Sequence, residues 1–184
     1  MSLSLNEFQA LIKKAAHGAG LDWGSAAEIA RAARLQAQSG DFDVAAFVAC
    51  LVRHYEQGAG VGRPTQLGDH WQGDGPLCPL MVGLCLCDWA HQLPQQIQGV
   101  QHPSLLQGFL ALINRQRDDR LVAHVLGDAV QIQPAPVAQT PMQSRVVLAD
   151  QQQADLDFWA SKTYAPATEA SRLAGAGAGV SDND

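Results

Sequence analysis

The sequence has little charge, few aromatic residues and almost no lysine. Of its 184 residues, 16% are charged and 6% are aromatic, and the lysines are Lys13, Lys14 and Lys162 alone. Hydrophobic residues nevertheless make up 47% of the chain, and the net charge is -6. A chain of this length can bury about two-thirds of its unfolded surface, so the composition excludes a chain that is disordered throughout.

Clustered basic residues and long apolar runs are also missing. Without clustered Lys and Arg, the chain is not a generic binder of the phosphate backbone, and we expect no nucleic-acid partner. The longest strongly apolar stretch, Pro76 to Cys87, spans about a dozen positions, whereas a membrane helix needs roughly 20. The segment from Met1 to Glu7 has no basic start typical of a signal peptide. We therefore expect a soluble, cytoplasmic protein with no membrane partner.

Cysteine is sparse, with only Cys50, Cys78, Cys85 and Cys87. Each lies among apolar neighbours, and we expect reduced, buried thiols with a structural role. Cys50 and His54 are one helical turn apart, but Cys-x-Cys is not the usual zinc clasp. We assign no metal ligands and leave the cofactor unknown, and a Cys/His metal site stays an alternative.

The first 58 residues predict three helices. Ser4 and Glu7 form the pattern of a capping box, and Gly18 or Gly20 would end the first helix. The second helix would start near Asp22 or Ser25 and stop at Gly40. The third would be capped by Asp41 and would run over residues 42–57, before Gly58.

The rest of the chain predicts a mixture of helices and strands. The expected elements are a helix over Pro79 to His91, a short strand at residues 97–100, a helix capped by Ser104 and ending near Ile113, a hairpin of residues 120–126 and 129–133 turning at Gly127-Asp128, a strand at residues 145–149 and a last element that begins at Leu156. The fold class is therefore α+β, with the helical segment 1–58, a mixed segment 59–168 that forms one domain with it, and a tail, 169–184.

The long segment from Gly58 to Pro76 is the first candidate for a functional site. Long irregular loops in compact domains are often functional. Asp69, His70 and Trp71 would suit a small polar ligand, and Arg63 could add a positive charge. The alternative is that Trp71 folds over the core with its indole N–H satisfied.

Glycines of the tail are the second candidate. Gly175, Gly177 and Gly179 alternate with small residues, so that their amides could surround an anion. No lysine follows and no strand-to-helix context surrounds them, so neither a P-loop nor a dinucleotide fingerprint is present. A flexible terminus, or a tail that docks on its own or a neighbouring subunit, is the alternative.

Two segments carry a resemblance to a known family. They are Leu3-Ser-Leu-Asn-Glu, running into Lys14-Ala-Ala-His-Gly-Ala-Gly-Leu-Asp-Trp-Gly, and the closing Ser171-Arg-Leu-Ala-Gly-Ala-Gly-Ala-Gly-Val-Ser-Asp-Asn-Asp. The sequence resembles an uncharacterised bacterial family known as domain of unknown function 3726. The resemblance implies a bacterial source and one full-length domain, and it supplies no activity.

Two functions from different classes follow from the residues. The first is binding of a small polar molecule near the 58–76 loop, with the glycine-rich tail as a lid and with no catalytic residue assigned. The second is a non-catalytic interaction or assembly protein, a homo-oligomer included, that uses its helical half or its tail. No Gly-x-Ser-x-Gly elbow is present, and whether the chain is an enzyme stays open.

Overall fold

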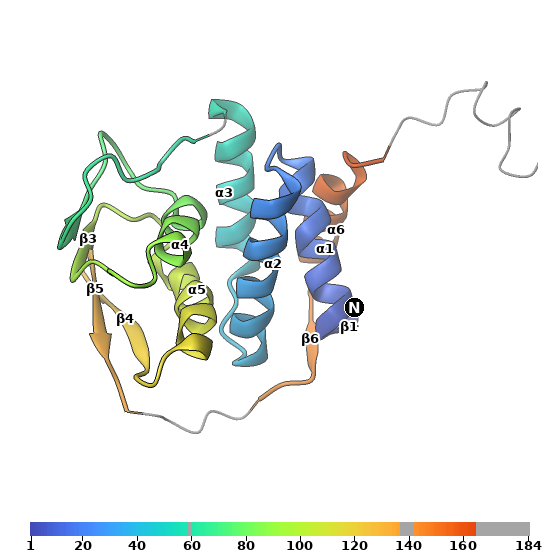
Figure 1. Cartoon of the computed structure of the whole chain (residues 1–184). Coiled ribbons are helices and arrows are strands. Elements are labelled where there is room, and N and C mark those ends of the chain that lie inside the picture. Colours follow the sequence, from blue (N-terminus) through green and yellow to red (C-terminus); the bar gives the residue numbers. More distant parts are fainter. Residues whose placement is uncertain (59, 137–141, 165–184) are drawn as a thin grey trace, which may run out of the picture.

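The described residues of the computed structural model, 1–58, 60–136 and 142–164, form an α+β fold built in layers (Figure 1). The helices are α1 (Leu5–Gly18), α2 (Trp23–Gln38), α3 (Val44–Gln57), α4 (Pro79–Asp88), α5 (Leu106–Ile113) and α6 (Asp150–Ser161). The strands are β1 (Ser2–Ser4), β2 (His70–Trp71), β3 (Gln96–Gln98), β4 (Leu121–Leu126), β5 (Ala129–Pro134) and β6 (Arg145–Val147). The predicted fold class and the three N-terminal helices are confirmed.

Side-chain caps begin each of the first three helices. Ser4 accepts a hydrogen bond from the Glu7 amide while Glu7 accepts one from the Ser4 amide, so the predicted capping box is confirmed. Asp22 caps α2 by accepting from the amides of Gly24 and Ser25. The third cap was predicted wrongly: Asp43, not Asp41, accepts from the Ala46 amide, and α3 starts two residues later than expected.

The first core joins the start of the described chain to its end. Alanines of α2 let α1 approach closely, and α6 then packs against α1 and α3. Strand β6 pairs antiparallel with β1, with Leu3 opposite Val146. The last element starts earlier than the sequence indicated, because Ala149 rather than a residue near Leu156 precedes the first turn of α6. No helix among the described residues is long and apolar enough to cross a membrane.

The second core lies between the helices α4 and α5 and a four-stranded sheet of order β2-β3-β5-β4 (Figure 1). The predicted hairpin is confirmed: Leu126 pairs with Ala129 across a two-residue turn in which Gly127 has a φ of 65°. Strand β3 pairs antiparallel with β5 on one side and parallel with β2 on the other.

Helices α4 and α5 differ from the sequence prediction at their ends. Pro79 occupies the first turn of α4 as expected, but the helix ends at Asp88 instead of His91, and Trp89 leads into a turn. Ser104 caps no helix. It lies within a 3₁₀ turn, Pro103–Leu105, whose start at His102 has a φ of 47°, and its carbonyl accepts a hydrogen bond from Gln36.

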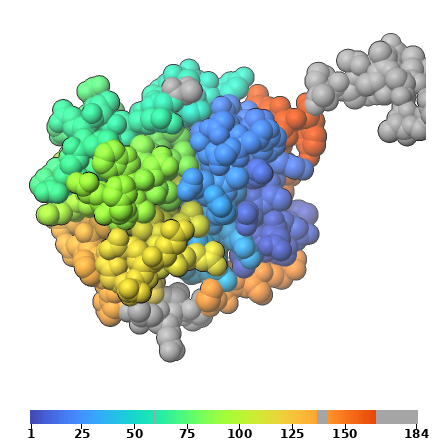
Figure 2. All heavy atoms as spheres, viewed as in Figure 1, coloured from blue at the N-terminus to red at the C-terminus, as the bar shows by residue number. Residues whose placement is uncertain are grey.

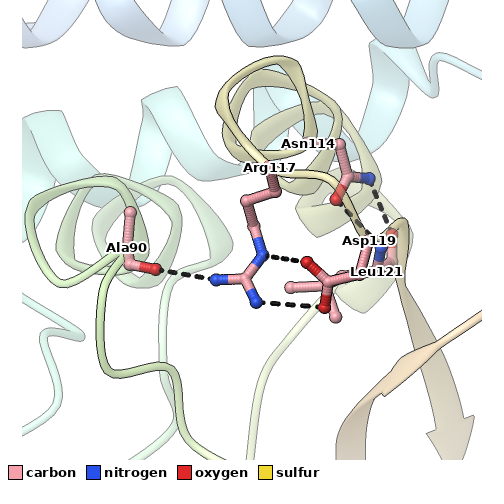
Figure 3. Close-up of polar contacts among 5 residues, drawn as sticks. All are labelled: Ala90, Asn114, Arg117, Asp119 and Leu121. Atoms are coloured by element: carbon pink, nitrogen blue, oxygen red, sulfur yellow. Dashed lines mark hydrogen bonds and ion pairs between the residues drawn. The ribbon is translucent and has the colours of Figure 1, made fainter.

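Polar side chains of α5 and of the turn after it contact the start of β4, and Figure 3 shows Asn114 and, from the end of that turn, Arg117. Asn114 donates to the Leu121 carbonyl at 2.8 Å and accepts from its amide at 2.9 Å. Gln107 forms the same two-bond pairing with Ala123, at 2.8 and 3.5 Å. Arg117 contacts Asp119 at 2.7 Å and lowers the pKa of that exposed carboxyl by hydrogen bonding to it. These contacts fix where β4 starts relative to α5.

The contact between α4 and α5 depends on Gly83, and this gives a first prediction. A Cβ at Gly83 would overlap the ring of Phe109, which is buried, whereas a Cβ at Gly75 would meet no atom within 4 Å. We expect Gly83→Ala to lower the free energy of unfolding by about 1–3 kcal/mol through overpacking, despite the better helix propensity of Ala.

The matched control for this prediction is Gly75→Ala, which should change the free energy of unfolding by less than about 0.5 kcal/mol. Urea denaturation of the two variants and the parent chain measures both effects. If Gly83→Ala were as stable as Gly75→Ala, the α4–α5 contact would tolerate a side chain at this position, contrary to the packing described.

Candidate functional site

The loop residues predicted to bind a ligand lie between α3 and α4, and the structure separates them. Arg63, Asp69 and His70 are exposed, whereas Trp71 is only 1% exposed. His70 and Trp71 form β2, in which successive side chains point to opposite faces. The indole therefore lies in the second core and faces away from the solvent side on which His70 lies.

One glycine of this loop, Gly62, allows the loop backbone to lie close to the backbone of Cys78. Gly62 has a φ of 71°, and its carbonyl accepts a hydrogen bond from the Cys78 amide at 2.9 Å. A Cβ at Gly62 would lie 2.6 Å from the Cys78 nitrogen. The glycines of the tail that were predicted to surround an anion, Gly175, Gly177 and Gly179, lie outside the described residues.

A different set of residues gathers where α1, α3 and α6 end and α2 begins. We call this the aromatic–lysine surface; its members are Lys13, Lys14, Trp23, Tyr55, Phe158, Lys162 and Tyr164. Figure 2 shows the end of α6 (red) beside the turn that leads into α2 (blue). All three lysines of the sequence belong to this surface.

Each of these lysines lies over an aromatic ring. The ammonium of Lys162 is 4.7 Å from the ring centroid of Tyr55 and 4.9 Å from that of Phe158. Lys13 and Lys14 lie 5.3 Å from the centroids of Trp23 and Tyr164, respectively. Contacts of this kind contribute about 0.5–1 kcal/mol each at exposed sites. They hold the lysine side chains beside the rings without burying the charges.

The rings of this surface are unusually open to solvent. Trp23 is 50% exposed, Tyr55 56%, Phe158 57% and Tyr164 62%. Below them, Trp159 is buried and contacts Tyr55 and Phe158 edge to face, at 5.3 Å between centroids in both cases. Two of the exposed rings, Tyr55 and Phe158, therefore rest on a buried side chain.

A groove between α1 and α6 continues the surface. Its volume is about 520 Å³. Its walls include the apolar Ala10, Leu11 and Ala160, together with Lys14 and Tyr164, whose hydroxyl accepts a hydrogen bond from the Lys14 ammonium at 3.0 Å. Glu7 and Asp157 also line the groove. Both carboxylates already accept hydrogen bonds. Glu7 accepts one from the Ser4 amide at the N-terminus of α1, and Asp157 accepts one from the Gln153 side chain.

Sequence reasoning missed this surface because its parts are distant in the chain. The ring of Trp23, for example, stacks on His17 of the preceding helix at 3.8 Å between centroids and stays half exposed. One signal was available: a sequence with only three lysines has two of them adjacent, at the end of the first predicted helix.

Potential metal ligands do not gather in the described part of the chain: no three His, Cys, Asp or Glu side chains come together there. His54 is buried near the Gly20 carbonyl, and its Nδ1 has no hydrogen-bond partner. Burial lowers the pKa of His54 because it disfavours the charged imidazolium, and Arg63 acts in the same direction. His54 is therefore a neutral ring within the core.

Comparison with known proteins gives one match. Residues 3–57 match the family model described as Protein of unknown function (DUF3726). The match contains the first of the two segments on which the resemblance rested, and it ends at the last residue of α3. No curated protein and no solved structure matches the chain.

The buried His54 predicts a dependence of stability on pH. Its pKa is lowered in the folded state, so its stabilising contribution is complete above the unfolded value of about 6.5. That contribution is lost as the pH falls from there through the lowered folded-state pKa. We expect Tm to fall between pH 7 and pH 5, and His54→Gln, which cannot be protonated, to make that fall smaller.

The control is His124→Gln, because His124 is exposed on β4 and its loss should leave the pH dependence of Tm unchanged. Thermal unfolding followed by circular dichroism at several pH values measures both variants. A His54→Gln chain with the same fall in Tm as the parent would show that other groups carry the acid sensitivity.

Proposed function

We propose that this chain is a non-catalytic interaction protein whose aromatic–lysine surface binds an acidic segment, with apolar side chains, on a partner protein. The observation that carries the proposal is that all three lysines of the sequence lie over exposed aromatic rings at one end of the helices. The proposal develops the second of the two functions predicted from the sequence.

Charge favours an acidic occupant. All three lysines of a chain with a net charge of -6 gather at one place, and the two carboxylates of the adjoining groove, Glu7 and Asp157, already accept hydrogen bonds within the chain. A positive patch accelerates the approach of a negative partner and repels partners of its own sign. Asp22, the acidic group next to Trp23, already accepts three hydrogen bonds at the start of α2, from Gly24, Ser25 and the Ser25 hydroxyl.

The exposed rings favour a partner with apolar side chains. Tyrosine, tryptophan and phenylalanine are enriched at the centres of protein interfaces, where they contribute most of the binding energy. Lysine stems add apolar area beside the rings while their ammonium groups stay in water. A segment that alternates carboxylates with aliphatic side chains matches both features.

A small polar ligand near the 58–76 loop receives less support from the geometry. Trp71, the ring that would have stacked on such a ligand, is buried in the second core. The exposed Asp69 contributes its backbone carbonyl to the amides of Gln95 and Gln96, at 2.8 and 3.1 Å. These two hydrogen bonds attach the loop to the start of β3. The loop therefore has a structural role in the sheet.

The experiment uses the full chain and a short fluorescent peptide in which glutamate alternates with leucine. We expect this peptide to bind, and a peptide of alternating lysine and leucine to bind at least about tenfold more weakly. Binding should weaken as salt is raised, because exposed charges are screened. Fluorescence anisotropy measures both affinities.

Variants test whether the binding occurs at the proposed surface. We expect Lys162→Glu and Phe158→Ala each to weaken the glutamate–leucine peptide about tenfold. Arg115→Glu, which makes the same charge change on an exposed residue after α5, should leave the affinity unchanged. Affinity that survives Lys162→Glu and Phe158→Ala, or no preference for the acidic peptide, would overturn the proposal.

A further inference from the structure

The segment of residues 165–184 begins directly beside the aromatic–lysine surface. It follows Tyr164, whose hydroxyl accepts a hydrogen bond from the Lys14 ammonium at 3.0 Å. Tyr164 and Lys14 both line the groove between α1 and α6. Residues 165–184 themselves lie outside the described part of the chain, but the point at which they leave it is one wall of that groove.

The charges of the 165–184 segment are opposite to those of the aromatic–lysine surface. Its acidic side chains are Glu169, Asp182 and Asp184, and Arg172 is its one basic side chain. The charged members of the surface, in contrast, are all lysines. Complementary charges favour the approach of two such groups and fix their register. The segment therefore has the acidic character that the proposed function requires of a partner.

The middle of the segment matches the groove in a different way. Residues 173–181 are uncharged and mostly small, with the sequence Leu173-Ala-Gly-Ala-Gly-Ala-Gly-Val-Ser. The groove has apolar walls at Ala10, Leu11 and Ala160, and its two carboxylates already accept hydrogen bonds within the chain. Glycine and alanine let a backbone lie close to such walls. An uncharged stretch also avoids repulsion by the two carboxylates.

Residues 173–181 can reach the whole groove from Tyr164. On α1 the groove extends from Glu7 to Lys14, which is roughly 10 Å along the helix. The connection of roughly nine residues after Tyr164 has an average span of about 15–18 Å if it is flexible. A segment tethered so closely meets the groove at a high effective concentration. Weak contacts are therefore enough to hold it there.

We infer that residues 165–184 occupy the groove between α1 and α6 and cover the surface around Lys14 and Tyr164. The inference rests on the proposed function, because it makes this segment an internal competitor of the acidic partner. Residues 173–181 lie in the groove, and the acidic residues on either side lie near the lysines. A partner must displace the segment, so its apparent affinity falls with the fraction of chains whose surface is free.

A fluorine label on Tyr164 measures whether the groove is covered. The sequence has two tyrosines, so a full chain that carries Tyr55→Phe and contains 3-fluorotyrosine has its single label at Tyr164. A neutral gadolinium chelate in solution relaxes this fluorine nucleus more strongly when the ring is uncovered. The amide variant carries Glu169→Gln, Asp182→Asn and Asp184→Asn, which remove the attraction to the lysines. We expect it to show at least about threefold more relaxation enhancement than the parent chain.

The matched control changes the same three positions and keeps their charge. Glu169→Asp, Asp182→Glu and Asp184→Glu together should leave the enhancement at Tyr164 as it is in the parent chain. Raised salt should increase the enhancement in the parent chain, because screening weakens the attraction. Equal enhancement in the parent chain and the amide variant would overturn the inference. Protection that disappears on about tenfold dilution would also overturn it, because the segment of a second copy would then be the occupant.

Binding of the glutamate–leucine peptide separates this inference from the proposed function. We expect the amide variant to bind that peptide at least about threefold more tightly than the parent chain, because more of its surface is free. Equal affinities would overturn the inference and leave the proposed function intact. If neither chain bound the peptide while Tyr164 stayed protected in the parent chain alone, the proposed function would fail, and residues 165–184 would still be the occupant of the groove.

Discussion

The passage of α6 over the end of α1 is the contact on which the rest of the described surface depends. A Cβ at Gly18 would collide with the backbone carbonyl of Trp159, so the two helices touch backbone to backbone at this point. Because Gly18 admits that approach, α6 brings Phe158, Lys162 and Tyr164 beside residues of α1 and α3. The pairing of β6 with β1 also brings the segment before α6 back to the start of the chain. The part of the aromatic–lysine surface that α6 contributes depends on this contact.

The two hydrophobic cores meet where α5 packs against α2, and few polar groups lie in this contact. Gly108 of α5 approaches α2 so closely that a Cβ there would lie 2.5 Å from the Ala32 carbonyl. Next to this contact the buried Gln36 donates to the carbonyls of Asp41 and Ser104, at 3.2 and 2.8 Å, and thereby connects α2 to the turn before α5. Small residues such as Gly108 set the distance between α2 and α5. The side chain of Gln36 fixes the position of α2 relative to the turn before α5. Shifts between the layers would leave the side-chain nitrogen of Gln36 unsatisfied in the core, which costs about 1–3 kcal/mol.

Patterns among neighbouring residues predicted some caps and turns correctly. They did not predict features that depend on residues far apart in the chain. The Ser4–Glu7 box and the Gly127–Asp128 turn depend on neighbours within three residues, and both were predicted correctly. The cap of α3 was placed on Asp41, directly after Gly40, whereas Asp43 caps the helix and Phe42, which precedes it, packs against the first core. The burial of Trp71 in the core was the alternative that the sequence left open, and the two-residue strand β2 that places the ring there is too short to show alternation in a sequence. The contact between Lys14 and Tyr164 spans 150 positions, and no pattern in the sequence indicates it.

The amide side chains of α5 and its following turn have a consequence for the open edge of the sheet. Strand β4 is the last in the order β2-β3-β5-β4, so among the described residues its outer amides and carbonyls have no neighbouring strand. Asn114 and Gln107 each donate to and accept from one residue of that edge, Leu121 and Ala123, respectively, as an adjacent strand would. An edge that is already satisfied offers no template to a second chain, and exposed edges are a common route to aggregation. In a chain with few charged residues, two neutral amides thus protect the first part of the β4 edge against edge-to-edge association.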